Sequence, residues 1–151
     1  MKIVIIYNVR SSHNVGAIFR TCDGAGVARI YLTGYTPTPL DRFGRPVGEI
    51  VKTSLGASSM VPWEKVEDIT EVIKKLRTAG VTIVAVEQAT NSVSLFDFKI
   101  PKQVAYIMGN EITGVIPEVL ALCDHIIEIP MSGQKESLNV SVSTGIVLFQ
   151  R

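Results

Sequence analysis

The sequence contains few of the residues on which secreted, metal-binding and membrane proteins depend. Its 151 residues include two cysteines, Cys22 and Cys123, too few for the disulfide framework of a small secreted domain. We therefore expect ordinary buried thiols in a reducing cytosol. The two histidines, His13 and His125, have no metal-ligand spacing to each other or to the cysteines. No apolar run approaches the ~20 residues of a membrane span, so we expect a cytoplasmic protein with neither a metal nor a membrane partner.

Two common nucleotide-binding motifs are also missing. The sequence has no Walker A motif, and no G-x-G-x-x-G follows the first predicted strand, which argues against a P-loop or a nicotinamide site. Charged residues make up only 19% of the chain and apolar residues 46%, a composition that excludes intrinsic disorder. We expect one domain over residues 1–151, with a single core.

The net charge of +1 conceals an asymmetry along the chain. Residues 1–58 carry seven basic and three acidic side chains, whereas the remaining residues carry eight basic and eleven acidic ones. A basic segment in a nearly neutral protein is either the contact surface for a phosphate-rich partner or a scatter of charges over a solvated face. The charge pattern alone leaves both interpretations open.

Short β-branched runs alternate with amphipathic helical patterns. Strands are expected at 3–7, 29–33, 81–86, 104–108 and 125–129, and helices at 14–25, 68–79, 117–123 and from 138 to the end. This alternation predicts an α/β fold with a mostly parallel sheet and helices on both faces. Residues 34–48 contain three prolines and three glycines, which is typical of a functional or mobile loop. Residues 137–143 fit a strand by alternation and a helix by their apolar stripe, and the pattern does not decide between them.

Three segments at or beyond strand ends carry small and polar residues, and ligands of open α/β sheets bind beyond the carboxyl ends of the strands. The first segment has Asn14 and Gly16 at a helix start, where free backbone N–H groups can meet an anion. The second is 108–111, directly after a buried strand, and the third combines 129–133 with 137–139. Taken singly, each segment can also be explained without a ligand, as a helix cap, a packing glycine or a turn.

Taken together, these segments resemble the motifs of the SPOUT superfamily, and within it the SpoU/TrmH-type RNA 2′-O-ribose methyltransferases. The matching residues are Asn14-x-Gly16-x-x-x-Arg20, then Ile107-Met108-Gly109-Asn110-Glu111, then Ile129-Pro130-Met131 with Ser137-Leu138-Asn139-Val140-Ser141. The resemblance covers the whole chain. It implies a C-terminal trefoil knot, a helix after Ser137, S-adenosyl-L-methionine bound in the knot, and a homodimer with the active site near its interface.

The resemblance also assigns roles to individual positions. It implies catalytic roles for Arg20, Asn14, Glu111, Ser137 and Asn139, and cofactor contacts from Met108, Gly109, Asn110, Ile129, Met131 and Leu138. With RNA as the partner, the basic residues expected to contact it are Arg10, Arg42, Arg45 and Lys52. A guanidinium loses its proton too reluctantly to act as a base, so we expect Arg20 to donate hydrogen bonds to the ribose oxygen or a phosphate.

Two other functions compete with ribose methylation of tRNA or rRNA. One is a non-catalytic RNA-binding module that keeps the fold, and the other is a methyltransferase that acts on a base. Retention of Arg20 and of the Asn110-Glu111 pair favours an enzyme, and Ser137-x-Asn139 favours ribose through the resemblance.

Overall fold

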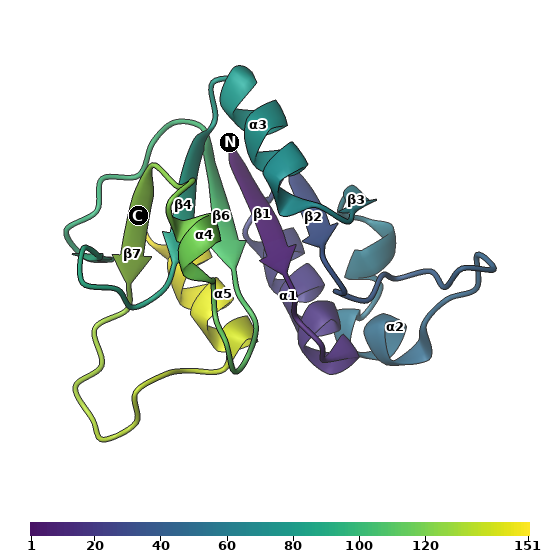
Figure 1. Ribbon diagram of the computed structural model, residues 1–151. Coiled ribbons are helices and arrows are strands. Elements are labelled where there is room, and N and C mark those ends of the chain that lie inside the picture. The colour runs from purple at the N-terminus through teal and green to yellow at the C-terminus, as the bar shows by residue number, and fades with distance from the viewer.

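The computed structural model describes all 151 residues and contains one seven-stranded sheet (Figure 1). The strands are β1 (Lys2–Tyr7), β2 (Arg29–Thr33), β3 (Trp63–Val66), β4 (Thr82–Val86), β5 (Val93–Ser94), β6 (Val104–Met108) and β7 (His125–Glu128). Their order across the sheet is β3-β2-β1-β6-β4-β7-β5, and every neighbouring pair is parallel. The expectation of a mostly parallel α/β sheet is therefore confirmed.

Helices cover both faces of the sheet, also as expected. They are α1 (Ser12–Gly24), α2 (Gly48–Ser54), the 3-10 turn η1 (Ala57–Ser59), α3 (Ile69–Thr78), α4 (Pro117–Leu120) and α5 (Val140–Phe149). Residues of α1, α2 and α5 share one apolar cluster, and residues of α3 and α4 share the other. Because successive strand side chains point to opposite faces, Val4 and Ile6 enter the first cluster while Ile3 and Ile5 enter the second.

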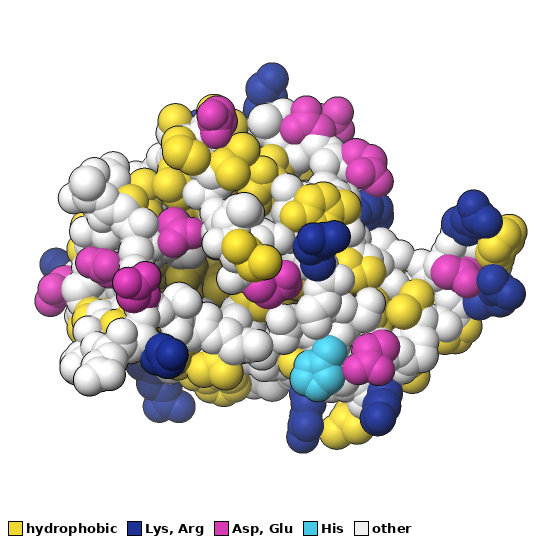
Figure 2. All heavy atoms as spheres, turned by 60° about the horizontal axis from the view of Figure 1, so that its bottom comes forward, with side chains coloured by type: hydrophobic (Ala, Val, Ile, Leu, Met, Phe, Trp, Pro, Cys, Tyr) yellow, Lys and Arg dark blue, Asp and Glu magenta, His cyan; other side chains and the backbone are white.

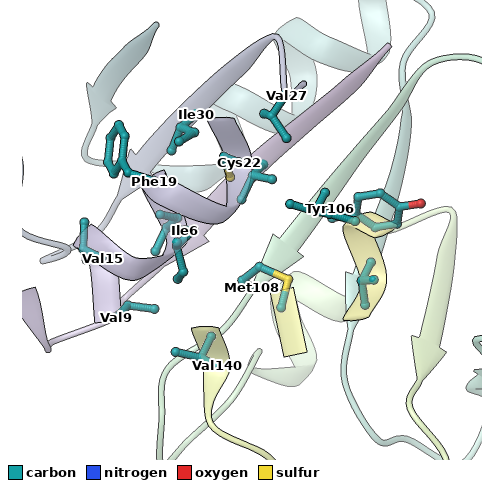
Figure 3. Packing of buried hydrophobic residues seen from close by; sticks show 14 of the residues in the cluster. Ile6, Val9, Val15, Phe19, Cys22, Val27, Ile30, Tyr106, Met108 and Val140 are labelled. Carbon is teal, nitrogen blue, oxygen red and sulfur yellow. The ribbon is translucent and has the colours of Figure 1, made fainter. Parts of the chain in front are cut away.

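The first apolar cluster holds α1 and α5 against the sheet. Figure 3 labels side chains of this cluster from β1, β2, β6, α1 and α5 (Ile6, Val15, Phe19, Cys22, Ile30, Tyr106, Met108 and Val140), together with Val9 and Val27 from the segments beside α1. Cys22 is fully buried, as expected, whereas Cys123 is only partly buried. No helix of the structure is both long enough and apolar enough to cross a membrane.

The prediction that α1 begins at Asn14 was wrong by two residues. The helix starts at Ser12, and the Ser11 side chain caps it by accepting a hydrogen bond of 3.1 Å from the Asn14 backbone N–H. Serine is as good an N-cap as asparagine, so the cap preference alone could not place the start.

The ambiguous segment 137–143 contains the start of a helix. The Asn139 side chain caps α5 by accepting a 2.9 Å hydrogen bond from the Ser141 N–H. The buried residues Val140, Thr144, Val147 and Leu148 recur at helical spacing and place α5 against α1. The helical pattern prevails because this apolar face packs against a neighbouring helix.

Candidate active site

A pocket of about 800 Å³ lies where the loops after β4, β6 and β7 meet the start of α5. It brings together nine of the residues named from the sequence: Met108, Gly109, Asn110, Glu111, Ile129, Met131, Ser137, Leu138 and Asn139. Figure 2 shows the hollow with apolar side chains in its depth and acidic side chains around it. The second and third sequence motifs therefore form a single site, whereas Asn14 and Arg20 do not line it.

Much of the pocket wall is backbone with unused hydrogen-bonding groups. The backbone N–H groups of Gly109, of Ile129 and of residues 131–138 donate to no other group of the chain. Apolar side chains of Met108, Ile129 and Leu138 lie beside these groups. Free N–H and C=O groups between apolar walls suit a flat ligand with hydrogen-bonding edges.

Gly109 has a steric role in the pocket. A Cβ at this position would lie 2.5 Å from the Gly114 carbonyl carbon and 2.8 Å from a Val115 methyl group. The loop after β6 therefore folds directly over the strand end because residue 109 has no side chain.

The Asn110 side chain supports this loop and is not free to bind a ligand. Its Nδ2 donates to the Asn8 carbonyl at 2.7 Å and to the Tyr35 hydroxyl at 3.0 Å. Its Oδ1 accepts from the N–H groups of Ile112 and Thr113, each at 2.8 Å. Asn110 lines the pocket, but its amide is already fully hydrogen-bonded within the protein, and this does not favour the expected contact of the amide with a cofactor.

Glu111 and Arg10 connect the pocket to the first motif loop. The Glu111 carboxylate accepts hydrogen bonds of 3.1 and 3.3 Å from the Arg10 backbone N–H. The Arg10 guanidinium lies 5.9 Å from the centre of the Tyr35 ring. Glu111 is exposed, and it positions the segment that follows β1.

The first and third motifs meet at a pair of asparagines. Asn139 Nδ2 donates to Asn14 Oδ1 at 3.3 Å, and Asn14 is 8% exposed. Gly16, in contrast, is a packing glycine, because a Cβ there would lie 1.8 Å from Thr53 Oγ1 and 2.8 Å from the Ile50 carbonyl oxygen of α2. It brings α1 and α2 together and does not cradle an anion.

Arg20 lies on the exposed side of α1, as its spacing from the apolar stripe predicted. It is six residues beyond Asn14, about 9 Å further along the helix axis, and it forms no ion pair within the chain. The candidate RNA contacts Arg42, Arg45 and Lys52 are also exposed. They lie on the segment between β2 and α2 and on α2, away from the pocket lining.

Sequence reasoning missed Glu87, which follows β4 and lines the pocket. Its Oε2 accepts a hydrogen bond of 2.9 Å from the Val115 N–H, and Gly114, at a φ of +63°, leaves room for the carboxylate. The available signal was a polar residue directly after a buried strand. With Glu111 and Glu128, Glu87 gives the pocket three carboxylates, and no lysine or arginine lines it.

The pocket's electrostatics favour a cationic ligand, since the carboxylates are uncompensated by basic lining residues. They are not arranged as a metal site, because no group of three or more His, Cys, Asp or Glu side chains could hold a metal ion.

Comparisons with known proteins identify the family of the chain. The profile of the SpoU rRNA Methylase family matches residues 1–149. The chain is 36% identical to the tRNA (guanosine(18)-2′-O)-methyltransferase of Aquifex aeolicus and 32% identical to the 23S rRNA (guanosine-2′-O-)-methyltransferase RlmB of Neisseria meningitidis. The alignments cover 98% and 97% of this chain, but only 67% and 56% of those relatives.

Solved structures show the same similarity in three dimensions. An AdoMet-bound rRNA methyltransferase from Sinorhizobium meliloti is 32% identical with a TM-score of 0.88, covering 98% of this chain and 54% of that one. The A. aeolicus TrmH/SpoU tRNA modifying enzyme is 34% identical with a TM-score of 0.84, covering 98% of this chain and 72% of that one. The chain belongs to the SpoU rRNA methylase family.

Proposed function

We propose that this chain transfers a methyl group from S-adenosyl-L-methionine to a ribose 2′-hydroxyl of RNA, with tRNA as the first candidate substrate and rRNA as the second. The observation that carries the proposal is the convergence of the second and third motifs on one acidic pocket with free backbone groups. Its relatives are named tRNA and 23S rRNA 2′-O-methyltransferases, and one structural neighbour is AdoMet-bound.

The pocket residues fit this cofactor. Free backbone groups at Gly109, Ile129 and Leu138 would hold the edges of the adenine, and Met108 and Met131 would contact its faces. The surrounding carboxylates, with Glu87 among them, favour the positive charge of a sulfonium. When bound, the cofactor would supply an activated methyl group and leave as S-adenosylhomocysteine, with the 2′-hydroxyl proton released to solvent, so the contribution of the protein is mainly positioning.

The ribose is held by the polar side chains at the edge of the pocket. Asn14 and Asn139 already form a hydrogen bond at 3.3 Å, and Ser137 lies on the same stretch before α5. In the proposed mechanism these groups orient the 2′-hydroxyl toward the pocket. Arg20 donates hydrogen bonds to the 2′-oxygen or to a neighbouring phosphate and stabilises the negative charge that develops during transfer.

Arg20 lies outside the pocket of its own chain, so we propose that a second copy supplies it in a homodimer. The exposed face of α5 supports a dimer, because Val142, Ile146 and Phe149 are 50%, 37% and 60% exposed at spacings of four and three residues. Large exposed apolar faces of this kind mark interaction surfaces. The packing of α1 against α5 places Arg20 on a helix next to that face.

Three further features belong to the same proposal. Residues 1–151 form one SPOUT methyltransferase domain, and the chain carries a trefoil knot between the loop after β6 and α5. The match of residues 1–149 to the SpoU rRNA Methylase family supports the knot. An RNA substrate and two free cysteines support a cytoplasmic location.

Cofactor binding and methyl transfer test the proposal. Calorimetry with S-adenosylhomocysteine in EDTA should give one site per chain, and the absence of binding at millimolar ligand would refute it. In single-turnover transfer to RNA, Arg20→Ala should lower the rate on the order of 10²–10³-fold, and Arg20→Lys should rescue poorly because it lacks the planar fork. The matched control is Lys74→Ala, an exposed cation on α3, which should transfer at the wild-type rate.

Nucleoside mass spectrometry of the product separates the competing functions. A 2′-O-methylated nucleoside supports ribose transfer, and a base-methylated one would replace it with a base-directed enzyme. RNA binding without any methyl transfer would indicate a non-catalytic binding module.

A further inference from the structure

The segment between β2 and α2 ends in a small hairpin that projects from the body of the protein (Figure 1). Leu40 and Pro46 pair across its base, and the Asp41 N–H donates to the Arg45 carbonyl at 2.8 Å. The turn passes through Gly44, whose φ of +73° favours glycine. We call residues 40–46 the hairpin tip.

The Asp41 side chain fixes the conformation of the hairpin tip. Its carboxylate accepts hydrogen bonds from the N–H of Phe43 at 2.8 Å and of Arg45 at 2.9 Å, and it forms an ion pair with Arg45 Nε at 3.0 Å. These hydrogen bonds, led by that from the Arg45 N–H, lower the pKa of Asp41 below its usual value. The tip is therefore ordered by its own contacts before any partner arrives.

The ordered tip displays an aromatic ring between two arginines. Phe43 is 66% exposed, and the guanidinium carbons of Arg42 and Arg45 lie 4.7 Å and 4.9 Å from its ring centre. Figure 2 shows basic side chains on both sides of the apolar group at this projecting end. No core contact explains the ring, since Phe43 belongs to neither apolar cluster.

We propose that Phe43 is a stacking platform for an unpaired RNA base, with Arg42 and Arg45 contacting the adjacent phosphates. A nucleobase stacks on the ring by taking the place of one of the two guanidinium groups that lie over it. The arginines are then close enough to contact the phosphates next to that base. The tip is outside the pocket lining, so the stacked base is a different nucleotide from the one that is methylated. This inference rests on the proposed function for its choice of RNA as the partner.

The test uses a probe in which single bases are free to stack. A 12-nucleotide oligouridylate with one central 2-aminopurine reports both affinity and stacking, and a 12-base-pair RNA duplex serves as the paired comparison. Phe43→Ala should weaken single-strand binding about 5- to 150-fold and leave duplex binding nearly unchanged. Phe43→Trp should retain single-strand binding, and Phe43→Leu should lose it, because leucine is apolar without a flat ring.

The salt dependence of RNA affinity distinguishes phosphate contacts of the arginines from base stacking on Phe43. Phe43→Ala should leave the slope of log affinity against log salt unchanged, whereas Arg42→Ala with Arg45→Ala should reduce it by about 1.4 for two phosphate contacts on a single strand. The matched control is Phe96→Ala, since Phe96 is 73% exposed and has no flanking arginine. It should bind both probes as the wild type does.

Several results would overturn the inference. Wild-type affinity of Phe43→Ala for the single strand would remove the stacking role, and wild-type affinity of Phe43→Leu would replace stacking with general apolar contact. Retention on anionic phosphatidylglycerol vesicles that is lost in Phe43→Ala, with RNA affinity unchanged, would assign the tip to membranes instead. If the wild type binds single strands through Phe43 but transfers no methyl group, the proposed catalytic function fails and the RNA-binding role of the tip stands.

Discussion

Replacement of Asn110 tests whether one buried side chain holds the loop over the pocket. Asn110 is 8% exposed and makes four hydrogen bonds of 2.7 to 3.0 Å, two as donor and two as acceptor. Each is worth about 0.5–1.5 kcal/mol net. Three of the four partner groups belong to the exposed residues Tyr35, Ile112 and Thr113 and can turn to water. We therefore expect Asn110→Ala to lower the free energy of unfolding by about 2–3 kcal/mol, measured by urea denaturation.

Asn110→Asp distinguishes the two donor bonds from the two acceptor bonds. The aspartate keeps both acceptors but directs a carboxylate oxygen at the Asn8 carbonyl, which lies 2.7 Å from Nδ2 in the native protein. This repulsion raises the pKa of the introduced carboxyl in the folded state. Its destabilising effect is then full above the raised folded-state pKa and declines as the pH falls toward the unfolded-state pKa, since the protonated group donates to Asn8 again.

The assay compares the variants at pH 5 and pH 8. The deficit of Asn110→Asp relative to wild type should shrink at pH 5, and that of Asn110→Ala should not change. Tyr35→Phe removes only the 3.0 Å bond and should cost about 0.5–1 kcal/mol. An Asn110→Ala variant within about 0.5 kcal/mol of wild type, the range of ordinary surface substitutions, would refute the reasoning.

Two further predictions concern packing and thiol chemistry. Gly16→Ala should lower the free energy of unfolding by about 1–3 kcal/mol, because its Cβ would lie 1.8 Å from Thr53 Oγ1. In the control variant Gly24→Ala, on the same helix, the new Cβ meets only an ordinary contact at 3.7 Å, so this change should be neutral or stabilising. If urea denaturation gives equal losses for the two variants, the steric argument is wrong. Burial, followed by the neighbouring Asp124, raises the pKa of the Cys123 thiol to about 11, so this thiol should react slowly with Ellman's reagent at pH 8 and rapidly once urea unfolds the chain. Because the folded state disfavours the thiolate, stability should decline as the pH rises from the ordinary thiol pKa toward 11, and the decline should be smaller in Cys123→Ser.

The central strands could be predicted because each is a short β-branched run whose side chains are buried on both faces. Val4 and Ile6 fill one core and Ile3 and Ile5 the other, a pattern that leaves no polar position within the strand. The convergence of the second and third motifs also follows from the sequence. Both motifs follow strands that run in the same direction, so they emerge at one edge of the sheet.

The elements that sequence reasoning missed are held by contacts between distant segments. In α2, Ile50 and Ser54 are the buried residues of a seven-residue helix, too few to show a period. Its packing depends on Gly16 in α1. The strand β5 has two residues and exists through its pairing with β7. None of these segments has a periodic apolar pattern that distinguishes it from a loop.

The motif residues divide into those that build the pocket and those that remain free to act. Gly109 contributes by lacking a side chain, and the Asn110 amide is saturated by hydrogen bonds within the protein, so the proposed cofactor contacts at these positions come from the backbone. A motif position can therefore shape the candidate pocket through its backbone, without a side chain that faces the pocket. Arg20 is the opposite case, because its guanidinium is exposed and unpaired but lies outside the pocket of its own chain. In the proposed mechanism, Arg20 acts only if α1 of a second copy of the chain approaches the pocket. The catalytic proposal therefore depends on dimerisation through the exposed apolar face of α5.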